Sequence, residues 1–130
     1  MDYIFENTDI VRDYECDLQG IVNNANYQHY LEHSRHLFVL SRGLSFSGLH
    51  EAGIDVVVAR FEIAYKIPLR PCDEYVCRLC PVNEGIRYIF HQAIFRKADN
   101  KLCVKATVDC VAMKEGRLIA GLPELDALLG

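Results

Sequence analysis

An aspartate followed by a glycine shortly before a predicted helix is the feature of this sequence best suited to chemistry. Asp17 begins the turn-like segment Asp-Leu-Gln-Gly, which ends at Gly20, and helical periodicity starts near Asn24. A carboxylate is ionised at neutral pH and can act as a nucleophile or as a general base. Unpaired N–H groups at a helix start can stabilise an oxyanion. Together these groups suit attack on a thioester, because a thiol leaving group needs no strong general acid.

Spacing alone favours structural roles for several residues that could also carry chemistry. Asp17 by itself is more typical of a turn or a helix cap. Cys77 and Cys80 have the spacing of half a zinc site, but residues three apart in a strand point to opposite faces. His29 and His33 flank a His-x-x-Glu-His pattern on one helical face, which the polar side of an amphipathic helix explains. We therefore expect no metal site.

The elements that would position Asp17 follow from hydrophobic periodicity. A helix is predicted from about residue 24 to residue 41, and a short second helix at residues 45–52. The residues that share one face of the long helix are Tyr27, Tyr30, Leu31, Ser34, Leu37, Phe38 and Ser41. Strands are predicted at residues 8–14, 55–65, 73–79, 86–96, 102–112 and 118–120, and a terminal helix from Pro123. This order predicts an α+β fold in which one long helix covers an antiparallel sheet of five to six strands.

The composition is that of a small globular domain. The chain has 130 residues, of which 51% are hydrophobic and 25% charged, and this fits a single domain spanning residues 1–130. The net charge is -4 and the 14 Lys and Arg residues are scattered, so no nucleic-acid surface is expected. No segment has the about 20 apolar residues of a membrane span, and the first residues lack secretory-signal features. A cytoplasmic protein with reduced cysteines is therefore expected.

Two segments resemble the 4-hydroxybenzoyl-CoA/acyl-CoA thioesterase family. The first is residues 13–27, with a continuation through residues 30–32 to Arg35. It contains an Asp-x-x-Gly-x-Val pattern followed by Asn-Tyr. The matching residues are Asp17, Gly20, Val22, Asn26 and Tyr27. The second is residues 65–73, which resemble the family's link between its second and third strands. The resemblance implies a hotdog fold, with a long central helix packed on a curved antiparallel sheet, and a homodimer or a dimer of dimers.

The same resemblance implies an acyl-CoA thioesterase site. Asp17 would be its catalytic carboxylate, and the backbone N–H of Asn24 would polarise the thioester carbonyl. The residues expected to line the substrate site are Gly20, Val22, Asn26 and Tyr27. Asn26 and Tyr27 would also shape the loop and the entry of the helix. CoA is part of the substrate, so no separate cofactor is implied. Many acyl-CoA members carry Tyr-His where this chain has Asn23 and Asn24, so the help of that histidine is absent here.

Contacts to the CoA phosphates and the type of reaction leave alternatives open. The candidate cations for the phosphates are Arg60, Arg87, Lys66 and Arg70. Solvated strand edges or ion pairs are the simpler explanation of each. A hotdog dehydratase or hydratase would pair an acid/base histidine with the carboxylate, and no histidine lies near Asp17 in the sequence. A non-catalytic module would keep the fold and bind acyl thioesters without turnover.

Overall fold

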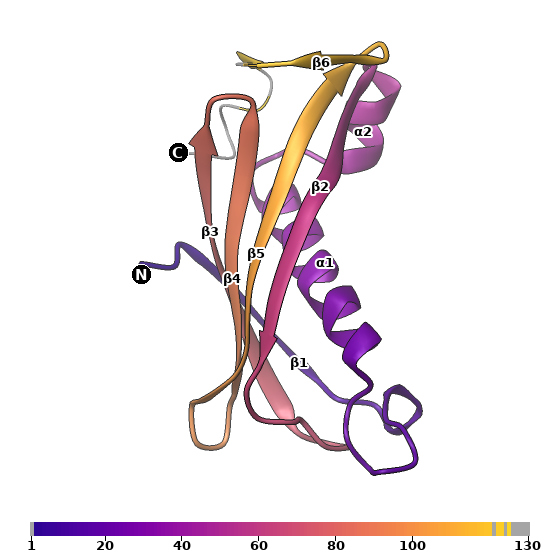
Figure 1. The fold of residues 1–130 in the computed structure, drawn as a ribbon, viewed down its shortest axis with the longest axis vertical. Helices are drawn as coiled ribbons and strands as arrows, with labels where there is room; N and C mark the ends of the chain where they lie inside the picture. The colour runs from indigo at the N-terminus through magenta and orange to yellow at the C-terminus, as the bar shows by residue number, and fades with distance from the viewer. Residues whose placement is uncertain (1, 121, 124, 126–130) are drawn as a thin grey trace.

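The computed structural model describes residues 2–120, 122, 123 and 125 and shows a long helix packed against an antiparallel sheet (Figure 1). The strands are β1 (Phe5–Ile10), β2 (Ile54–Tyr65), β3 (Glu74–Glu84), β4 (Arg87–Arg96), β5 (Lys101–Lys114) and β6 (Arg117–Ile119). The helices are α1 (Asn24–Ser41) and α2 (Phe46–Glu51), and a 3-10 turn spans Asp13–Glu15. The predicted α+β architecture with one long helix is confirmed.

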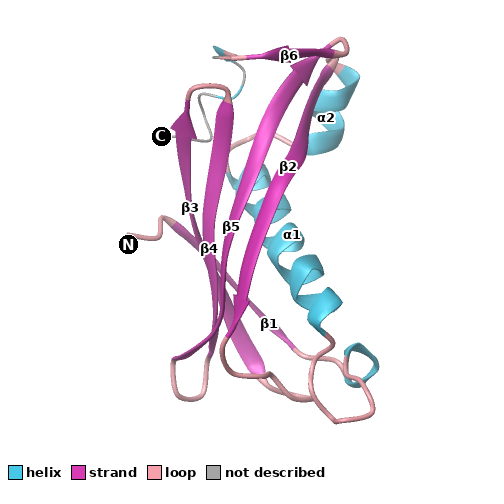
Figure 2. Ribbon diagram, in the orientation of Figure 1, coloured by secondary structure: helices cyan, strands magenta, loops and turns pink. Residues whose placement is uncertain are grey.

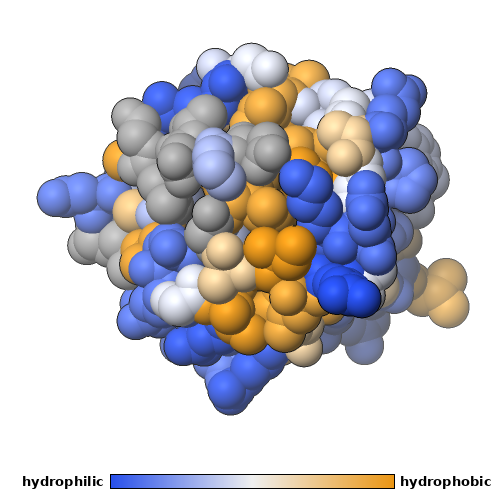
Figure 3. All heavy atoms as spheres, turned by 90° about the horizontal axis from the view of Figure 1, so that it is seen from above, coloured by the Kyte–Doolittle hydropathy of each residue, from blue (hydrophilic) through white to orange (hydrophobic). Residues whose placement is uncertain are grey.

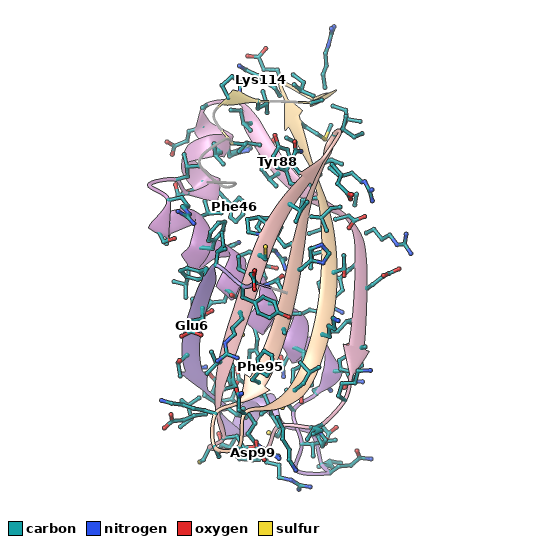
Figure 4. All side chains as sticks on the ribbon, turned by 90° about the vertical axis from the view of Figure 1, so that its left-hand side faces the viewer. Glu6, Phe46, Tyr88, Phe95, Asp99 and Lys114 are labelled. Carbon is teal, nitrogen blue, oxygen red and sulfur yellow. The ribbon has the colours of Figure 1, made fainter. Side chains whose placement is uncertain are left out.

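The sheet brings several connections together at one end of the molecule. Its strand order is β1-β3-β4-β5-β2, with β6 paired to β5 (Figure 2). Glu84 pairs with Arg87 across the β3–β4 turn, where Gly85 takes a positive φ of 61°. β5 runs from near Asp99 at one end of the molecule to Lys114 at the other (Figure 4). The β1–α1 loop and the β2–β3 connection lie at the Asp99 end (Figure 1).

The core lies between α1 and one face of the sheet. The buried residues of α1 are Tyr27, Tyr30, Leu31, Ser34, Arg35, Phe38 and Val39. Leu79, Phe90 and Val108 point inward from three neighbouring strands and are buried. The Phe38 ring packs edge-on against the Phe90 ring, with 6.4 Å between their centroids. This packing fixes α1 on the sheet and thereby places its N-terminus at the end with the β2–β3 connection.

β1 begins and ends earlier than predicted. It stops at Ile10, whereas the apolar pattern predicted a strand up to residue 14. The Val11 N–H still donates to the Asp73 carbonyl at 2.9 Å. The Glu15 carboxylate then accepts the Arg12 N–H at 2.8 Å, which closes the 3-10 turn and bends the chain out of the sheet.

Other differences concern element lengths and faces. β3 continues to Glu84 rather than ending at residue 79, because β4 pairs with it along its whole length. Leu37 is half-buried and Ser41 is exposed, although both were expected on the buried face of the helix, and Arg35 is buried instead. The terminal helix predicted from Pro123 lies largely outside the described residues.

Arg35 is a cation within the core. Its side chain is covered by the sheet, and its Nη1 donates to Gln92 Oε1 at 2.9 Å. The Gln92 amide in turn donates to the Leu31 carbonyl at 3.0 Å. Burial lowers the pKa of the Arg35 guanidinium. The pair joins α1 to β4 by polar contacts where apolar packing was expected.

β2 forms an exposed edge of the sheet. Among the described strands it pairs with β5 alone, so its other edge lacks a partner. Val57, Val58 and Tyr65 on this strand are 40%, 49% and 42% exposed. Such an apolar edge is a template for pairing with a further strand.

The end of the molecule that carries β6 and α2 has an apolar surface of its own. Figure 3 looks onto this end and shows a band of hydrophobic residues between hydrophilic ones. Ile86 and Leu118 are among the exposed apolar residues of the protein, at 41% and 53%. Neither helix in the described part of the chain has the length and apolarity needed to cross a bilayer.

Candidate active site

Residues 16–22 form a tight loop that carries Asp17. Cys16 and Val22 form a bridge at its base, and the Asp17 N–H donates to the Ile21 carbonyl at 2.9 Å. The Gly20 N–H donates to the Asp17 carbonyl at 3.0 Å, and Gly20 has a φ of 74°, which glycine adopts without strain. The predicted turn is confirmed, and Gly20 is required by its geometry.

The carboxylate of Asp17 faces solvent. Its Oδ1 accepts the Gln19 N–H at 2.8 Å, an interaction that fixes the carboxylate within the turn. Within the described residues it makes no ion pair, and its second oxygen has no hydrogen-bond donor. One oxygen is therefore available to attack a carbonyl or to accept a proton from water.

The start of α1 presents one backbone donor next to this loop. Asn23 is the N-cap, and its Oδ1 accepts the Ala25 N–H at 2.9 Å. The Asn26 N–H donates to the Asn23 carbonyl at 2.9 Å. In the described part of the chain, the Asn24 N–H is left without an acceptor, as expected for a first helical residue. The partial positive charge of the helix terminus adds to its capacity to stabilise an oxyanion.

Val22 and Tyr27 anchor the loop to the β2–β3 connection. Both are buried, and the Val22 N–H donates to the Leu69 carbonyl at 2.9 Å. The Leu69 N–H donates to the Tyr27 hydroxyl, also at 2.9 Å. Both backbone groups of Leu69 are thus hydrogen-bonded. These two hydrogen bonds join residues 13–27 to residues 65–73, the two segments that resemble the family motifs. The sequence did not single out Leu69, because its role lies in its backbone.

Glu15 holds the other side of the loop. Its carboxylate Oε1 accepts the Arg12 N–H and the Tyr30 hydroxyl, each at 2.8 Å. Its carbonyl accepts the Asn23 N–H at 3.1 Å and the Asn26 side-chain amide at 2.7 Å. The Asn26 side chain therefore links the first turn of α1 to Glu15. Glu15 was missed in the sequence, although its place two residues before Asp17 was a signal that could have found it.

A small apolar cavity of about 190 Å³ lies beside the start of α1. The residues that line it are Ile21, Val22, Asn24, Tyr27, Tyr65, Lys66, Ile67, Pro68 and Cys103. The Tyr65 hydroxyl donates to the carbonyl of Asn24, the first residue of α1, at 3.4 Å. Asp17 and Gly20 do not line this cavity; they lie on the neighbouring loop. The cavity offers an apolar group a place next to the Asn24 backbone.

Comparison with known proteins matches this architecture. The model of the thioesterase-like superfamily aligns with residues 11–127, which include the Asp17 loop, the helix and the whole β2–β6 sheet. The chain belongs to the thioesterase-like superfamily. The predicted thioesterase family and hotdog fold are therefore confirmed.

Three known proteins are similar to this chain in sequence or in structure. A chloroplastic acyl-acyl carrier protein thioesterase of Arabidopsis thaliana is 37% identical over 97 residues, which cover 74% of this chain and 51% of that protein. A hypothetical protein from Aquifex aeolicus has a TM-score of 0.91 at 27% identity, covering 98% of this chain and 100% of that one. A 1,4-dihydroxy-2-naphthoyl-CoA thioesterase from Synechocystis has a TM-score of 0.88 at 16% identity, covering 95% and 94%. This chain thus spans about half the length of the Arabidopsis relative.

In this thioesterase-like protein, Arg60 and Arg87 lie on the face of the sheet away from α1. Both line a hollow of about 330 Å³ together with Asp109, which pairs with Arg60 in the strand register. Arg87 Nη1 is 2.9 Å from Asp109 Oδ2, and Arg60 forms an ion pair with Glu62. The structure does not bring either arginine together with Asp17 in a single chain. Contact of these arginines with CoA stays a prediction.

Among the cavity-lining residues that the site prediction omitted, Tyr65 has the most direct contact with the start of α1. Tyr65 was noted only as an apolar strand position, yet its ring lies 5.7 Å from that of Tyr27 and its hydroxyl reaches Asn24. Lys66, one of the predicted cations, lines the same cavity, whereas Arg70 does not. Because Tyr65 is far from the helix in sequence, only the pairing of β2 with β5 places it there.

Proposed function

We propose that the protein hydrolyses an acyl-CoA thioester to a free acid and CoA, with Asp17 as nucleophile or general base. The observation that carries the proposal is the exposed Asp17 carboxylate on a loop that leads directly into a helix whose Asn24 N–H has no acceptor among the described residues. The apolar cavity at Asn24 suits part of the acyl chain. Superfamily membership supports thioesters as the substrate class.

Either role of Asp17 gives the same products. As nucleophile, a carboxylate oxygen forms a bond to the thioester carbon and the C–S bond breaks, which releases the CoA thiolate and leaves a mixed anhydride for water to hydrolyse. As general base, the carboxylate takes a proton from a water molecule that attacks the same carbon. In both routes negative charge develops on the carbonyl oxygen, where the Asn24 N–H can stabilise it. CoA is part of the substrate, and the proposal needs no further cofactor.

The first test is release of thiol from aromatic and aliphatic acyl-CoAs, followed with a thiol-reactive dye. We expect Asp17→Asn to lower kcat by about 100-fold or more, because it removes the nucleophile or base while retaining the turn. Asp13→Asn is the matched control, since Asp13 is an exposed carboxylate of the preceding 3-10 turn. Because Cys72 is exposed, the dye must first be titrated against the protein alone.

Each result of that test has a defined meaning. Equal turnover by wild type and Asp17→Asn would refute the catalytic role of Asp17. Binding of acyl-CoA by wild type without turnover would instead support a non-catalytic module. Hydration or dehydration of an acyl thioester would instead indicate a hotdog hydratase or dehydratase. That chemistry pairs an acid/base histidine with the carboxylate, and no described histidine contacts Asp17.

The thiol carrier can be tested in the same assay. The Arabidopsis relative is named for acyl carrier protein substrates, whereas the Synechocystis neighbour is named for a CoA thioester. We propose CoA as the carrier for this chain. A kcat/KM for acyl carrier protein thioesters well above that for the matching acyl-CoAs would contradict this choice.

We further propose that two copies associate along the free edge of β2, as a dimer that can pair again into a dimer of dimers. The edge is 12 residues long and exposes Val57, Val58 and Tyr65. Since Tyr65 also lines the cavity at Asn24, a second copy on this edge would enclose the site. Burial of apolar area and pairing of the free backbone groups would both favour the association.

A further inference from the structure

We infer that Glu15 is the positioning residue of this site, which fixes the Asp17 carboxylate relative to the Asn24 N–H. The inference rests on the proposed thioesterase function. Glu15 lies two residues before Asp17, and its carbonyl accepts the N–H of Asn23, the residue directly before Asn24. Its carboxylate is bonded to the Tyr30 hydroxyl on the second turn of α1. The same residue therefore restrains both reacting groups against one rigid helix.

The surroundings of the Glu15 carboxylate make this restraint strong. The side chain is 15% exposed, and the nearest cationic nitrogen, Arg12 Nη1, is 3.8 Å from Oε2. A carboxylate so covered depends on hydrogen-bond donors, and the Arg12 N–H and the Tyr30 hydroxyl supply them. The Tyr30 ring stacks on Tyr75 with 4.6 Å between centroids, which holds the hydroxyl in place. Burial, together with the bond to Glu15, raises the pKa of Tyr30, so the hydroxyl remains a donor throughout the assay range.

Loss of this restraint affects turnover more than substrate binding. Attack requires the Asp17 oxygen and the Asn24 N–H at a fixed separation, and a misplacement of about 1 Å can lower the rate by roughly 100-fold. The cavity is lined by other residues, among them Tyr65 and Ile67, which make no bond to Glu15. The expected signature is therefore a lower kcat at a nearly unchanged KM.

Steady-state kinetics of a graded series tests the inference. Glu15→Gln keeps an acceptor oxygen for Tyr30 and Arg12, and we expect its kcat to stay within about fivefold of wild type. Glu15→Ala removes the acceptor, and we expect a loss of roughly 10- to 100-fold in kcat with KM changed less than about threefold. Tyr30→Phe should lower kcat in the same way, and the double variant should be no slower than Glu15→Ala alone.

Matched controls separate positioning from general loss of stability. Asp13→Asn removes a carboxylate from the same 3-10 turn, and Tyr14→Phe removes an exposed phenol from that turn. Both should retain wild-type kcat. All variants are assayed well below their unfolding temperatures. A Glu15→Ala kcat within twofold of wild type, or a loss that appears in KM alone, would overturn the inference.

A measurement without substrate separates this inference from the proposed function. Amide hydrogen exchange of residues 16–24 should be faster in Glu15→Ala than in wild type and unchanged in Asp13→Asn. Unchanged exchange in Glu15→Ala contradicts the restraint itself. A wild-type protein inactive on every thioester refutes the proposed function. An active wild type with a fully active Glu15→Ala refutes the positioning role alone.

Discussion

At the scale of single residues, hydrogen bonds to backbone groups hold the loop of the site in place, and their partners are both side-chain and backbone atoms. The Leu69 N–H is satisfied by the Tyr27 hydroxyl, and the Asn23 N–H by the Glu15 carbonyl. Leu69 and Tyr27 are buried, so water cannot replace the hydroxyl if it is removed. The stability of the loop therefore depends on a few polar atoms in an apolar setting.

Tyr27→Phe should destabilise the protein by about 1–3 kcal/mol, because it leaves the buried Leu69 N–H without an acceptor. Chemical denaturation followed by circular dichroism measures the difference. Tyr14→Phe is the control, since Tyr14 is 78% exposed, and it should leave the midpoint unchanged. Equal midpoints for Tyr27→Phe and wild type would show that this bond contributes nothing to folding.

At the scale of elements, the start of α1 has both a structural and a proposed chemical role. Asn23 caps the helix by accepting the Ala25 N–H, and this capping leaves the Asn24 N–H as the free donor. A backbone N–H is present whichever side chain the residue has. The absence of the family's Tyr-His pair at residues 23–24 therefore leaves the proposed oxyanion donor intact.

Asn23→Ala should lower the free energy of unfolding by about 1 kcal/mol, because the Ala25 N–H loses its cap. The matched control is Asn24→Ala, whose side chain makes no hydrogen bond within the described residues. Thermal unfolding of the two variants compares them directly. A control as unstable as Asn23→Ala would contradict the capping role.

At the scale of the whole molecule, the proposed site and the free edge of β2 adjoin each other. Tyr65 belongs to both, because it ends the exposed edge strand and lines the cavity beside Asn24. Assembly along this edge and access to the cavity are then coupled.

The thiols differ in their access to solvent, since Cys77, Cys103 and Cys110 are buried in the core.

Val58→Asp should weaken the proposed dimer, because it places a charge on the edge where a second strand would pair. Sedimentation velocity should show a shift toward monomer, and kcat/KM should fall with it. Leu118→Asp is a comparable control on β6, where Leu118 is 53% exposed. A wild-type protein that sediments as a monomer at all concentrations would rule out the dimer.

Alkylation at about pH 8 should modify Cys72 much faster than Cys77, Cys103 or Cys110. Burial raises the pKa of all three enclosed thiols, that of Cys110 to about 11, so little thiolate is present at that pH. Mass spectrometry after timed labelling identifies the sites, and denaturant should make all six cysteines reactive. Rapid native labelling of Cys110 would contradict the described core.

The sequence by itself determined the features that arise from neighbouring residues. Examples are the Asp17–Gly20 turn, the helix from Asn24 and the alternation of buried and exposed residues along β5. Each depends on hydrogen bonds and side-chain directions within a few residues, so the types and spacing of neighbouring residues are enough to predict it. Recognition of the motif around Asp17 then supplied the family.

Only the tertiary structure decided which distant groups meet. The bonds from Tyr30 to Glu15 and from Leu69 to Tyr27 join residues 15 and 42 positions apart, and the burial of Arg35 depends on Gln92 in β4. The length of β1 likewise depends on its pairing with β3. The physical reason is that a long-range contact depends on where the whole chain places its partner, and local periodicity carries no information about that placement.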